Sequence, residues 1–156
     1  MTAHIFSLQQ SNGGVPKTPV REAEVGPLGM AGDKQNDMVH HGGPERALCL
    51  YSLEAILALQ REGHPIYPGS VGENVTITGL DWAALKPGDR LHLGDVLVEI
   101  TRDTTPCFKI AGSFRDGKFT RIAQKVHPGW SRLYARVLEG GTLHVGLPVH
   151  VEQECT

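Results

Sequence analysis

The sequence predicts a mainly β protein, a compact barrel of short strands with tight turns and a few short helices. Two observations lead to this fold class. Turn-forming residues are frequent and spread along the chain, with 19 glycines and 10 prolines in 156 residues, which favours many short elements. Apolar or alternating stretches of strand length lie between these turns, whereas a single segment has the periodicity of an amphipathic helix.

The bulk composition is typical of one globular domain that spans residues 1–156. Apolar residues make up 40% and charged residues 21% of the chain, which are ordinary values for a soluble protein. The formal net charge of −2 excludes the basic footprint of a protein that binds nucleic acid or an anionic membrane. No apolar run approaches the ~20 residues that span a bilayer, and no signal peptide is visible at the N-terminus.

The N-terminal part is expected to form strands separated by polar loops. Residues 4–8 are predicted as the first strand, and residues 21–25 as a later one. Residues 15–20 contain two prolines, which exclude a helix and remove backbone donors. This segment is therefore expected to be an extended edge that displays Lys17 and Thr18.

The central part contains a buried strand followed by the one clear helix. Residues 47–51 form a continuous apolar run of strand length. Ser52 is placed to cap a helix that spans residues 53 to about 62, and Gly63 supplies its C-terminal stop. This helix is amphipathic and is expected to pack on the sheet as a frame element.

The C-terminal half is expected to contain two hairpins of one design, joined by a long connection. Residues 90–93 and 96–101 are predicted to pair through a turn at Gly94-Asp95. The sequence of 91–99 is echoed by 143–152, which predicts a second hairpin. The other predicted elements are strands at 75–78 and 130–138 and short helical turns at 82–85, 108–111 and 119–126.

Three cysteines, odd in number and without CxxC spacing, indicate free thiols in a reducing cytoplasm rather than a disulfide framework or a zinc site. Cys49 lies inside an apolar run and is expected to be an inert core thiol, and Cys155 lies one residue from the chain end. Cys107 follows a proline where a strand leaves the predicted sheet. Cations nearby favour its thiolate, which is both a nucleophile and a soft metal ligand, so Cys107 is the main functional candidate. A purely structural role is the alternative.

The remaining candidates are scattered over loops. His40 and His41 are adjacent on an extended segment, so their side chains point to opposite faces and are unsuited to gripping one metal together. Proximity of His41 to Cys107 would create a thiol nucleophile with a histidine base; a histidine hydrogen-bonded to backbone is the alternative. A single basic, hydroxyl or amide side chain on a loop is more often a solvated surface residue than a ligand contact. Together, the five remaining donors suit a pocket that binds phosphate: Lys17, Thr18, Arg46, Asn74 and Arg102.

Several short motifs occur in a fixed order along the chain: Asn12-Gly13-Gly14-Val15-Pro16-Lys17, Gly32-Asp33-Lys34-Gln35, His40-His41-Gly42-Gly43-Pro44-Glu45-Arg46-Ala47, Gly72-Glu73-Asn74, Gly88-Asp89-Arg90-Leu91, Pro106-Cys107, and Arg136-Val137-Leu138 with Gly140-Gly141. Each motif is weak alone, but the ordered series is specific. It resembles the MOSC domain, named after the C-terminal part of molybdenum cofactor sulfurase, in its small stand-alone bacterial form. The resemblance covers about residues 4–152. The form that the chain resembles is similar to proteins that reduce N-hydroxylaminopurine.

This resemblance implies a pyruvate-kinase-like MOSC β-barrel with a few short α-helices. In family members that are enzymes, the cysteine that Cys107 matches ligates the molybdenum of the molybdenum cofactor (Mo-molybdopterin). Those enzymes reduce N-hydroxylated compounds with electrons from partner redox proteins. By the same similarity, Lys17 and Thr18 occupy a loop that holds the cofactor, Asn74 lies in a second such loop, and His41 and Gly42 match the family's histidine-glycine-glycine segment. The phosphate of the cofactor needs basic donors, for which Arg46 and Arg102 are available, and His41 is a catalytic candidate beside Cys107.

Three functions stay open on the sequence alone. The favoured one is a molybdenum-cofactor oxidoreductase acting on small N-hydroxylated molecules, with a flavin or iron–sulfur protein as electron donor. It is favoured because donors spread over several loops suit a phosphorylated cofactor. The second is a sulfur carrier or transferase with a persulfide on Cys107, and the third is a non-catalytic module that binds a pterin or an anion. The oligomeric state is left open, a dimer included.

Overall fold

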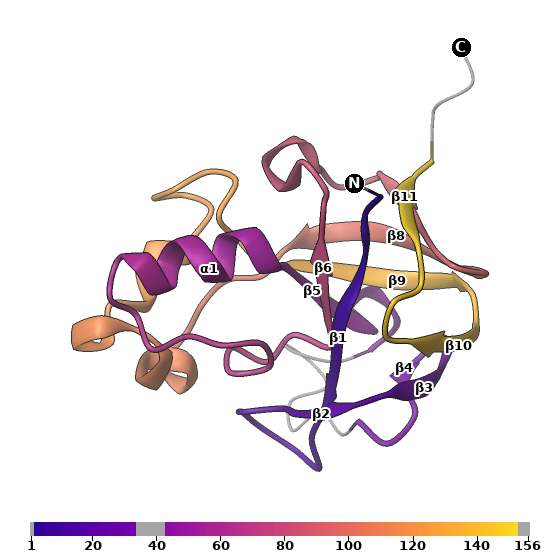
Figure 1. The fold of residues 1–156 in the computed structure, drawn as a ribbon, viewed down its shortest axis with the longest axis horizontal. Helices are drawn as coiled ribbons and strands as arrows, with labels where there is room; N and C mark the ends of the chain where they lie inside the picture. The colour runs from indigo at the N-terminus through magenta and orange to yellow at the C-terminus, as the bar shows by residue number, and fades with distance from the viewer. Residues whose placement is uncertain (1, 34–42, 153–156) are drawn as a thin grey trace.

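The computed structural model describes residues 2–33 and 43–152, and within these ranges the chain is mainly β (Figure 1). The strands are β1 (His4–Gln10), β2 (Thr18–Val20), β3 (Glu22–Gly26), β4 (Gly29–Met30), β5 (Leu48–Ser52), β6 (Val75–Thr78), β7 (Arg90–Leu93), β8 (Val96–Asp103), β9 (Leu133–Glu139), β10 (Gly141–His144) and β11 (Val149–Val151). The helical elements are α1 (Leu53–Arg61) and the 3-10 turns η1 (Pro44–Arg46), η2 (Trp82–Ala84), η3 (Phe108–Ser113), η4 (Arg115–Gly117) and η5 (Phe119–Ile122). The predicted fold class is confirmed at this level.

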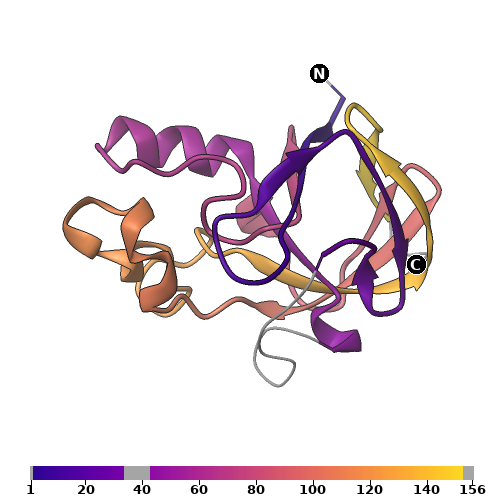
Figure 2. The same cartoon turned by 90° about the horizontal axis from the view of Figure 1, so that it is seen from below.

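The described strands form two sheets that curve around one apolar core (Figure 2). The larger sheet has the order β11-β7-β8-β9-β5-β6-β1-β2, and the smaller has the order β10-β3-β4. Described neighbours pair antiparallel except β5 and β6, which are parallel and are connected through α1. A helix is the usual connection for such a parallel pair.

The strand pairing of the larger sheet does not close it into a barrel in the described residues, because its order ends at β11 and β2. β1 nevertheless reaches the segment around β11. The Ile5 amide donates to Leu147 O and the Val149 amide donates to Ala3 O, each at 2.9 Å, and one isolated bridge joins His4 to Pro148. The predicted barrel is therefore approached but not confirmed.

The helix prediction is confirmed nearly to the residue. The Ser52 hydroxyl accepts a hydrogen bond from the Ala55 amide at 3.1 Å, which satisfies one of the free donors of the first turn. Gly63, with a φ of +97°, follows the last turn in the left-handed region that glycine favours. Ile56 and Leu59 are fully buried and attach the helix to the core.

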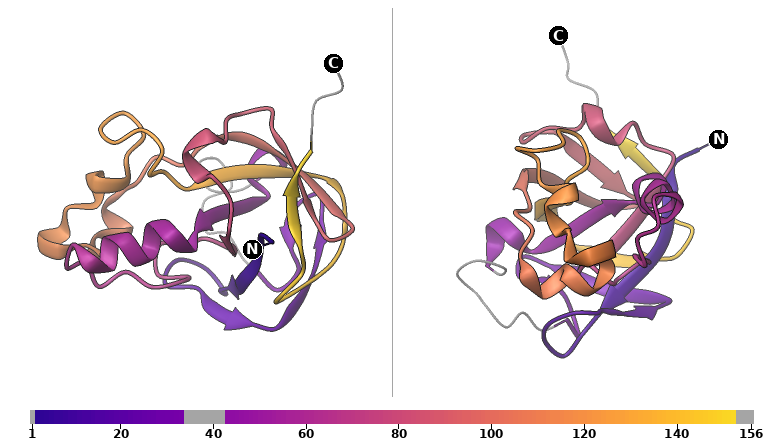
Figure 3. Two further views of the ribbon diagram at one scale, coloured as in Figure 1. Left: turned by 45° about the horizontal axis from the view of Figure 1, so that its top comes forward. Right: turned by 90° about the vertical axis from the view of Figure 1, so that its left-hand side faces the viewer.

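The 3-10 turns after β8 lie beside α1, away from the curved sheets (Figure 3). The Arg121 guanidinium donates two hydrogen bonds to the Glu62 carboxylate, at 2.9 and 2.8 Å, and lies 4.1 Å from the centre of the Trp130 ring. The Arg115 amide donates to His64 Nδ1 at 2.9 Å. These contacts fix the segment that follows Cys107 against the helix. None of the helices in the described ranges combines the length and apolar character needed to cross a bilayer.

The prediction of a second hairpin is wrong. β10 pairs with β3, whereas β11 pairs with β7, so the two echoed strands enter different sheets. Two features of the chain explain the difference. The connection 145–148 contains Pro148 and is longer than the two-residue Gly94-Asp95 turn. Gly140 also lets the chain approach β3, since a Cβ atom there would lie 2.4 Å from Val25 O.

We expect Ser52→Ala to lower the free energy of unfolding by about 1 kcal/mol, because the Ala55 amide loses its side-chain acceptor. Urea unfolding followed by circular dichroism measures this change. Ser52→Thr keeps a hydroxyl at the cap and is expected to retain most of the stability. Equal losses in both variants would show that packing, and not the cap, is responsible.

Candidate functional site

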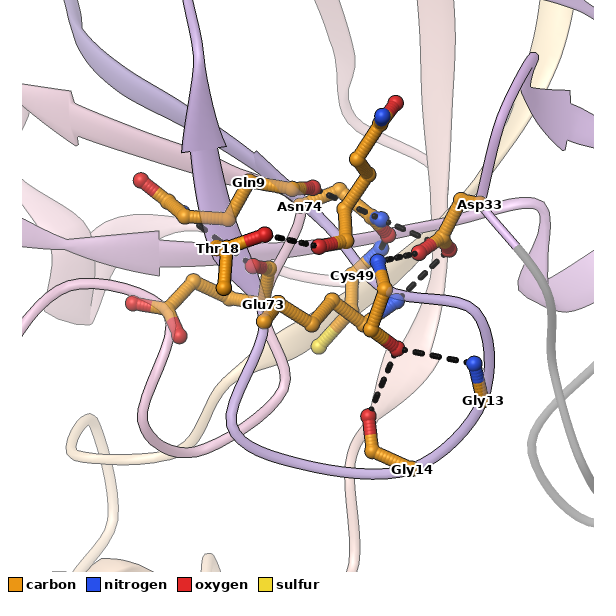
Figure 4. Close-up of polar contacts among 11 residues, drawn as sticks. Gln9, Gly13, Gly14, Thr18, Asp33, Cys49, Glu73 and Asn74 are labelled. Atoms are coloured by element: carbon orange, nitrogen blue, oxygen red, sulfur yellow. Dashed lines mark hydrogen bonds and ion pairs between the residues drawn. The ribbon is translucent and has the colours of Figure 1, made fainter.

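A buried ion pair lies where the ends of β1 and β5 meet the loop before β2 (Figure 4). Asp33 accepts from Lys17 Nζ at 2.6 Å and from Asn74 Nδ2 at 2.9 Å through Oδ2, and from the Ser11 amide at 2.9 Å through Oδ1. The side chains of Lys17 and Asp33 are 9% and 3% exposed. The prediction that Lys17 is displayed is therefore wrong, because a carboxylate distant in sequence draws it inward.

Asn74 joins three strands of the larger sheet. Its Oδ1 accepts from the Cys49 amide at 3.0 Å, and its Nδ2 donates to Gln9 O at 3.4 Å as well as to Asp33. Its own backbone amide donates to Cys49 O at 2.7 Å. Both protons of the Nδ2 group are thus used inside the protein. The structure gives Asn74 a positioning role, and its direct contact with a cofactor stays a prediction.

Glu73, which precedes Asn74, is fully buried. The Thr76 hydroxyl donates to Glu73 Oε2 at 3.2 Å, and Gln9 Nε2 donates to Glu73 O at 3.1 Å. Burial raises the pKa of the Glu73 carboxyl to about 7, since desolvation disfavours the charged form. Sequence reasoning missed this titratable group, although it lies inside the Gly72-Glu73-Asn74 motif.

One face of the larger sheet gathers two of the predicted basic residues. Tyr134 on β9 is in register with Cys49 on β5 and with Arg102 on β8, so the three side chains project from the same face. The Arg46 guanidinium lies 5.6 Å from the centre of the Tyr134 ring. Cys49 Sγ lies 3.9 Å from the Thr104 hydroxyl. Strand pairing thus places Arg102 beside Tyr134, and η1 brings Arg46 to the ring of the same tyrosine.

Burial governs the protonation of this face. It raises the pKa of the Cys49 thiol and raises that of Tyr134 to about 12, against the opposing effect of the Arg132 charge. Both groups therefore stay protonated at neutral pH, and the predicted buried state of Cys49 is confirmed. Arg132 is itself 6% exposed and donates to Val71 O at 2.7 Å, while its Nε has no partner among the described residues. No local sequence pattern predicts this buried cation.

Cys107 lies at the exit of β8, as predicted. The Thr104 amide donates to Arg132 O at 2.9 Å, which fixes the chain just beyond the end of β8. Cys107 then starts η3, and its carbonyl accepts from the Ile110 amide at 3.1 Å. The residue is a free cysteine of intermediate burial, whereas Cys49 is buried.

Thr18 does not join this arrangement. Thr18 is exposed on the edge strand β2, where its hydroxyl donates to Gln10 O at 3.2 Å. His41 and Gly42 lie outside the described residues. Among the residues that are described, no group of three or more His, Cys, Asp or Glu side chains is arranged to hold a metal ion.

We expect Asp33→Ala to lower the free energy of unfolding by about 3 kcal/mol, because it leaves the buried Lys17 ammonium without its counter-charge. Lys17→Met removes the other partner. The double variant should cost less than the sum of the two single changes by at least about 1 kcal/mol. Denaturant unfolding of the four proteins completes the cycle, and strictly additive losses would contradict the coupling.

Glu73 predicts a pH dependence of stability. Its folded pKa lies above the ordinary value of 4.5, so its stabilising contribution is complete below pH 4.5 and is lost as pH rises through 7. We expect wild type to lose up to about 3 kcal/mol relative to Glu73→Gln between pH 5 and pH 8. Urea unfolding over this range tests the sign. Glu22→Gln, at an exposed position on β3, should follow the wild-type curve, and a pH-independent difference between wild type and Glu73→Gln would be incompatible with the assignment.

The comparisons with known proteins agree on one family. The family model of the MOSC domain matches residues 37–150. The chain is 33% identical over 116 residues to protein YflK of Bacillus subtilis and 31% identical over 118 residues to protein YiiM of Escherichia coli. These matches cover 74% and 72% of this chain and 52% of each relative, so the chain spans about half the length of these curated relatives. A protein of Gibberella moniliformis named reductase is 32% identical over 112 residues, which are 68% of this chain and 19% of that protein.

Solved structures have the same fold. The crystal structure of YiiM from Geobacillus stearothermophilus matches with a TM-score of 0.74 and 26% identity, over 97% of this chain and 75% of that one. The YuaD protein from Bacillus subtilis matches with a TM-score of 0.79 and 17% identity, over 99% of this chain and 98% of that one, a likeness of fold alone. Because the family model matches well over half of the chain, this protein belongs to the MOSC domain family.

Proposed function

We propose that this protein is an oxidoreductase that uses the molybdenum cofactor to reduce N-hydroxylated small molecules, with Cys107 as the protein ligand of the metal. The observation that carries the proposal is the accessible Cys107 thiol at the end of β8, the strand that also contributes Arg102 to the basic face. The MOSC family is commonly associated with the molybdenum cofactor, and the relative named reductase supports a redox activity.

The residues present fit an anionic cofactor that carries a soft metal. A thiolate sulfur is a suitable ligand for such a centre, and Cys107 is the described thiol that is not buried. The Arg46 guanidinium lies near the Tyr134 ring, and Arg102 is paired with Tyr134 across β8 and β9. Guanidinium groups suit the bidentate binding of a phosphate. Arg132 adds a buried donor, Nε, that has no partner in the described part of the chain.

The reaction requires two electrons and two protons, and it converts an N–OH group into N–H with release of water. When bound, the cofactor supplies the redox chemistry. Cys107 anchors it, Arg46 and Arg102 hold its phosphate, and Tyr134 remains a neutral hydroxyl because its pKa is raised to about 12. The Lys17–Asp33–Asn74 contacts hold the loop before β2 against the sheet, so the basic face keeps its shape.

The electrons would come from a partner redox protein of flavin or iron–sulfur type, which is part of the proposal. We also place the reaction in the reducing cytoplasm, where the free thiols Cys49 and Cys107 would persist. His41, which lies outside the described residues, is retained as a candidate near the catalytic centre.

Molybdenum content tests the assignment of Cys107. We expect protein from a host that makes the cofactor to contain molybdenum, and Cys107→Ser to lose most of it because serine replaces the soft ligand with a hard one. Cys49→Ser is the matched control, since its thiol is buried and protonated, and it should keep the metal. Inductively coupled plasma mass spectrometry gives the metal-to-protein ratio.

Absence of molybdenum from both the wild type and Cys107→Ser would contradict the proposal. Mass spectrometry of the intact, unreduced protein then distinguishes the remaining functions. An additional sulfur on wild type that Cys107→Ser abolishes would identify a sulfur carrier, and an unmodified thiol would leave a binding module.

A further inference from the structure

A small pocket lies beside η3, the turn that begins directly after Cys107. Its volume is about 210 Å³, and its walls come from residues 15–16, 65–70 and 109–113. Pockets for drug-sized ligands usually measure roughly 300–1,000 Å³. The pocket is therefore suited to a ligand of about one ring.

The walls of the pocket combine apolar and polar groups and are held in place by hydrogen bonds. Val15, Pro16 and Tyr67 contribute flat or aliphatic surface, and the Tyr67 side chain is about half exposed at the rim. The Tyr67 amide donates to Ser70 Oγ at 3.0 Å, and the Ser70 amide donates to Tyr67 O at 2.9 Å. The Lys17 amide donates to Gly69 O at 2.9 Å, which ties two of the three walls together. A pocket formed in advance loses little free energy to ordering when a ligand binds.

Lys109 supplies the charge of the pocket. It is the single Lys, Arg, His, Asp or Glu among the described residues that line the pocket, and no ion pair involves Lys109 in the described part of the chain. The Ser113 hydroxyl donates to Ser70 O at 3.3 Å, and the Ser70 hydroxyl oxygen accepts from the Tyr67 amide, which leaves the Ser70 proton as a neutral donor in the pocket that Lys109 also lines. An anion on the ligand would therefore meet Lys109 as its main partner, through a charge-assisted hydrogen bond.

We propose that this pocket binds a small planar ring that carries an anionic group, with the ring between Pro16 and Tyr67 and the anion on Lys109. If the function proposed above holds, on which this second step rests, the pocket selects N-hydroxylated aromatic acids as substrates. The position of the pocket supports this, because Lys109 and Ile110 follow Cys107 within a single turn.

Binding is tested without the cofactor reaction, by titrating ¹⁵N-labelled protein with benzoate and with its neutral analogue benzamide. We expect saturable shifts of amide signals in residues 67–70 and 110–113, with benzoate bound about fivefold more tightly, the scale of one exposed ion pair. Lys109→Gln should abolish this preference. Lys125→Gln, at an exposed position outside the pocket, is the matched control and should keep it.

A second variant tests the location of the site. Gly112 lines the pocket, and a Cβ atom added there meets nothing within 4 Å, so Gly112→Leu should add bulk at the pocket wall without a clash at its Cβ atom. We expect it to remove the binding of both probes while the rest of the spectrum is preserved. Shifts outside the pocket, equal affinities for the two probes, or unchanged binding in Gly112→Leu would overturn the site.

The substrate step has its own readout. On the cofactor-loaded protein, kcat/KM for 4-carboxyphenylhydroxylamine should exceed that for phenylhydroxylamine about fivefold, and Lys109→Gln should bring the ratio close to one. Reduction of both compounds with a ratio that Lys109 does not influence would overturn the substrate assignment. Binding of benzoate at the pocket together with absence of any reduction would instead contradict the proposed function and leave the pocket intact.

Discussion

The candidate site depends on Asp33, a carboxylate that is nearly inaccessible to water. A buried charge is costly unless it is paired and hydrogen-bonded, and here an ammonium group, an amide side chain and a backbone amide surround it. Through Lys17 it fixes the loop before β2, and through Asn74 it reaches the backbone of β5. Asp33 therefore holds the loop and the sheet together through Lys17 and Asn74.

The two described thiols show how one sheet creates two chemical environments. Cys49 lies within β5, where burial raises the pKa of its thiol. Cys107 lies beyond the end of β8, where the chain has left the sheet and the side chain is partly accessible. The same residue type is thus kept unreactive at one position and available at the other. The contrast agrees with the local sequence, because Cys49 lies inside an apolar run and Cys107 follows a proline just beyond a strand.

Local sequence patterns predicted most elements of the fold but not the long-range polar contacts. The apolar run at 47–51 and the Ser52 cap act over a few residues, and both were predicted. The inward turn of Lys17 depends on Asp33, sixteen residues away, and the grouping of Arg102 with Tyr134 depends on strand register. The prediction of a second hairpin is wrong for a related reason. The connection between its strands contains Pro148, and its first strand, β10, pairs with β3. Cys107 was predicted since a proline before it and a strand end mark its position locally.

The hydrogen bonds between residues 3–5 and 147–149 have a consequence for how this domain can be used within longer chains. They place the beginning and the end of the described fold side by side (Figure 1). A domain whose two ends meet can be inserted into a host protein at one surface loop, since the host chain enters and leaves at nearly the same point. The same geometry permits circular permutation, in which a short linker joins the old ends and new ends open elsewhere. The contact between β1 and the segment before β11 thus makes the domain suitable for insertion and for permutation.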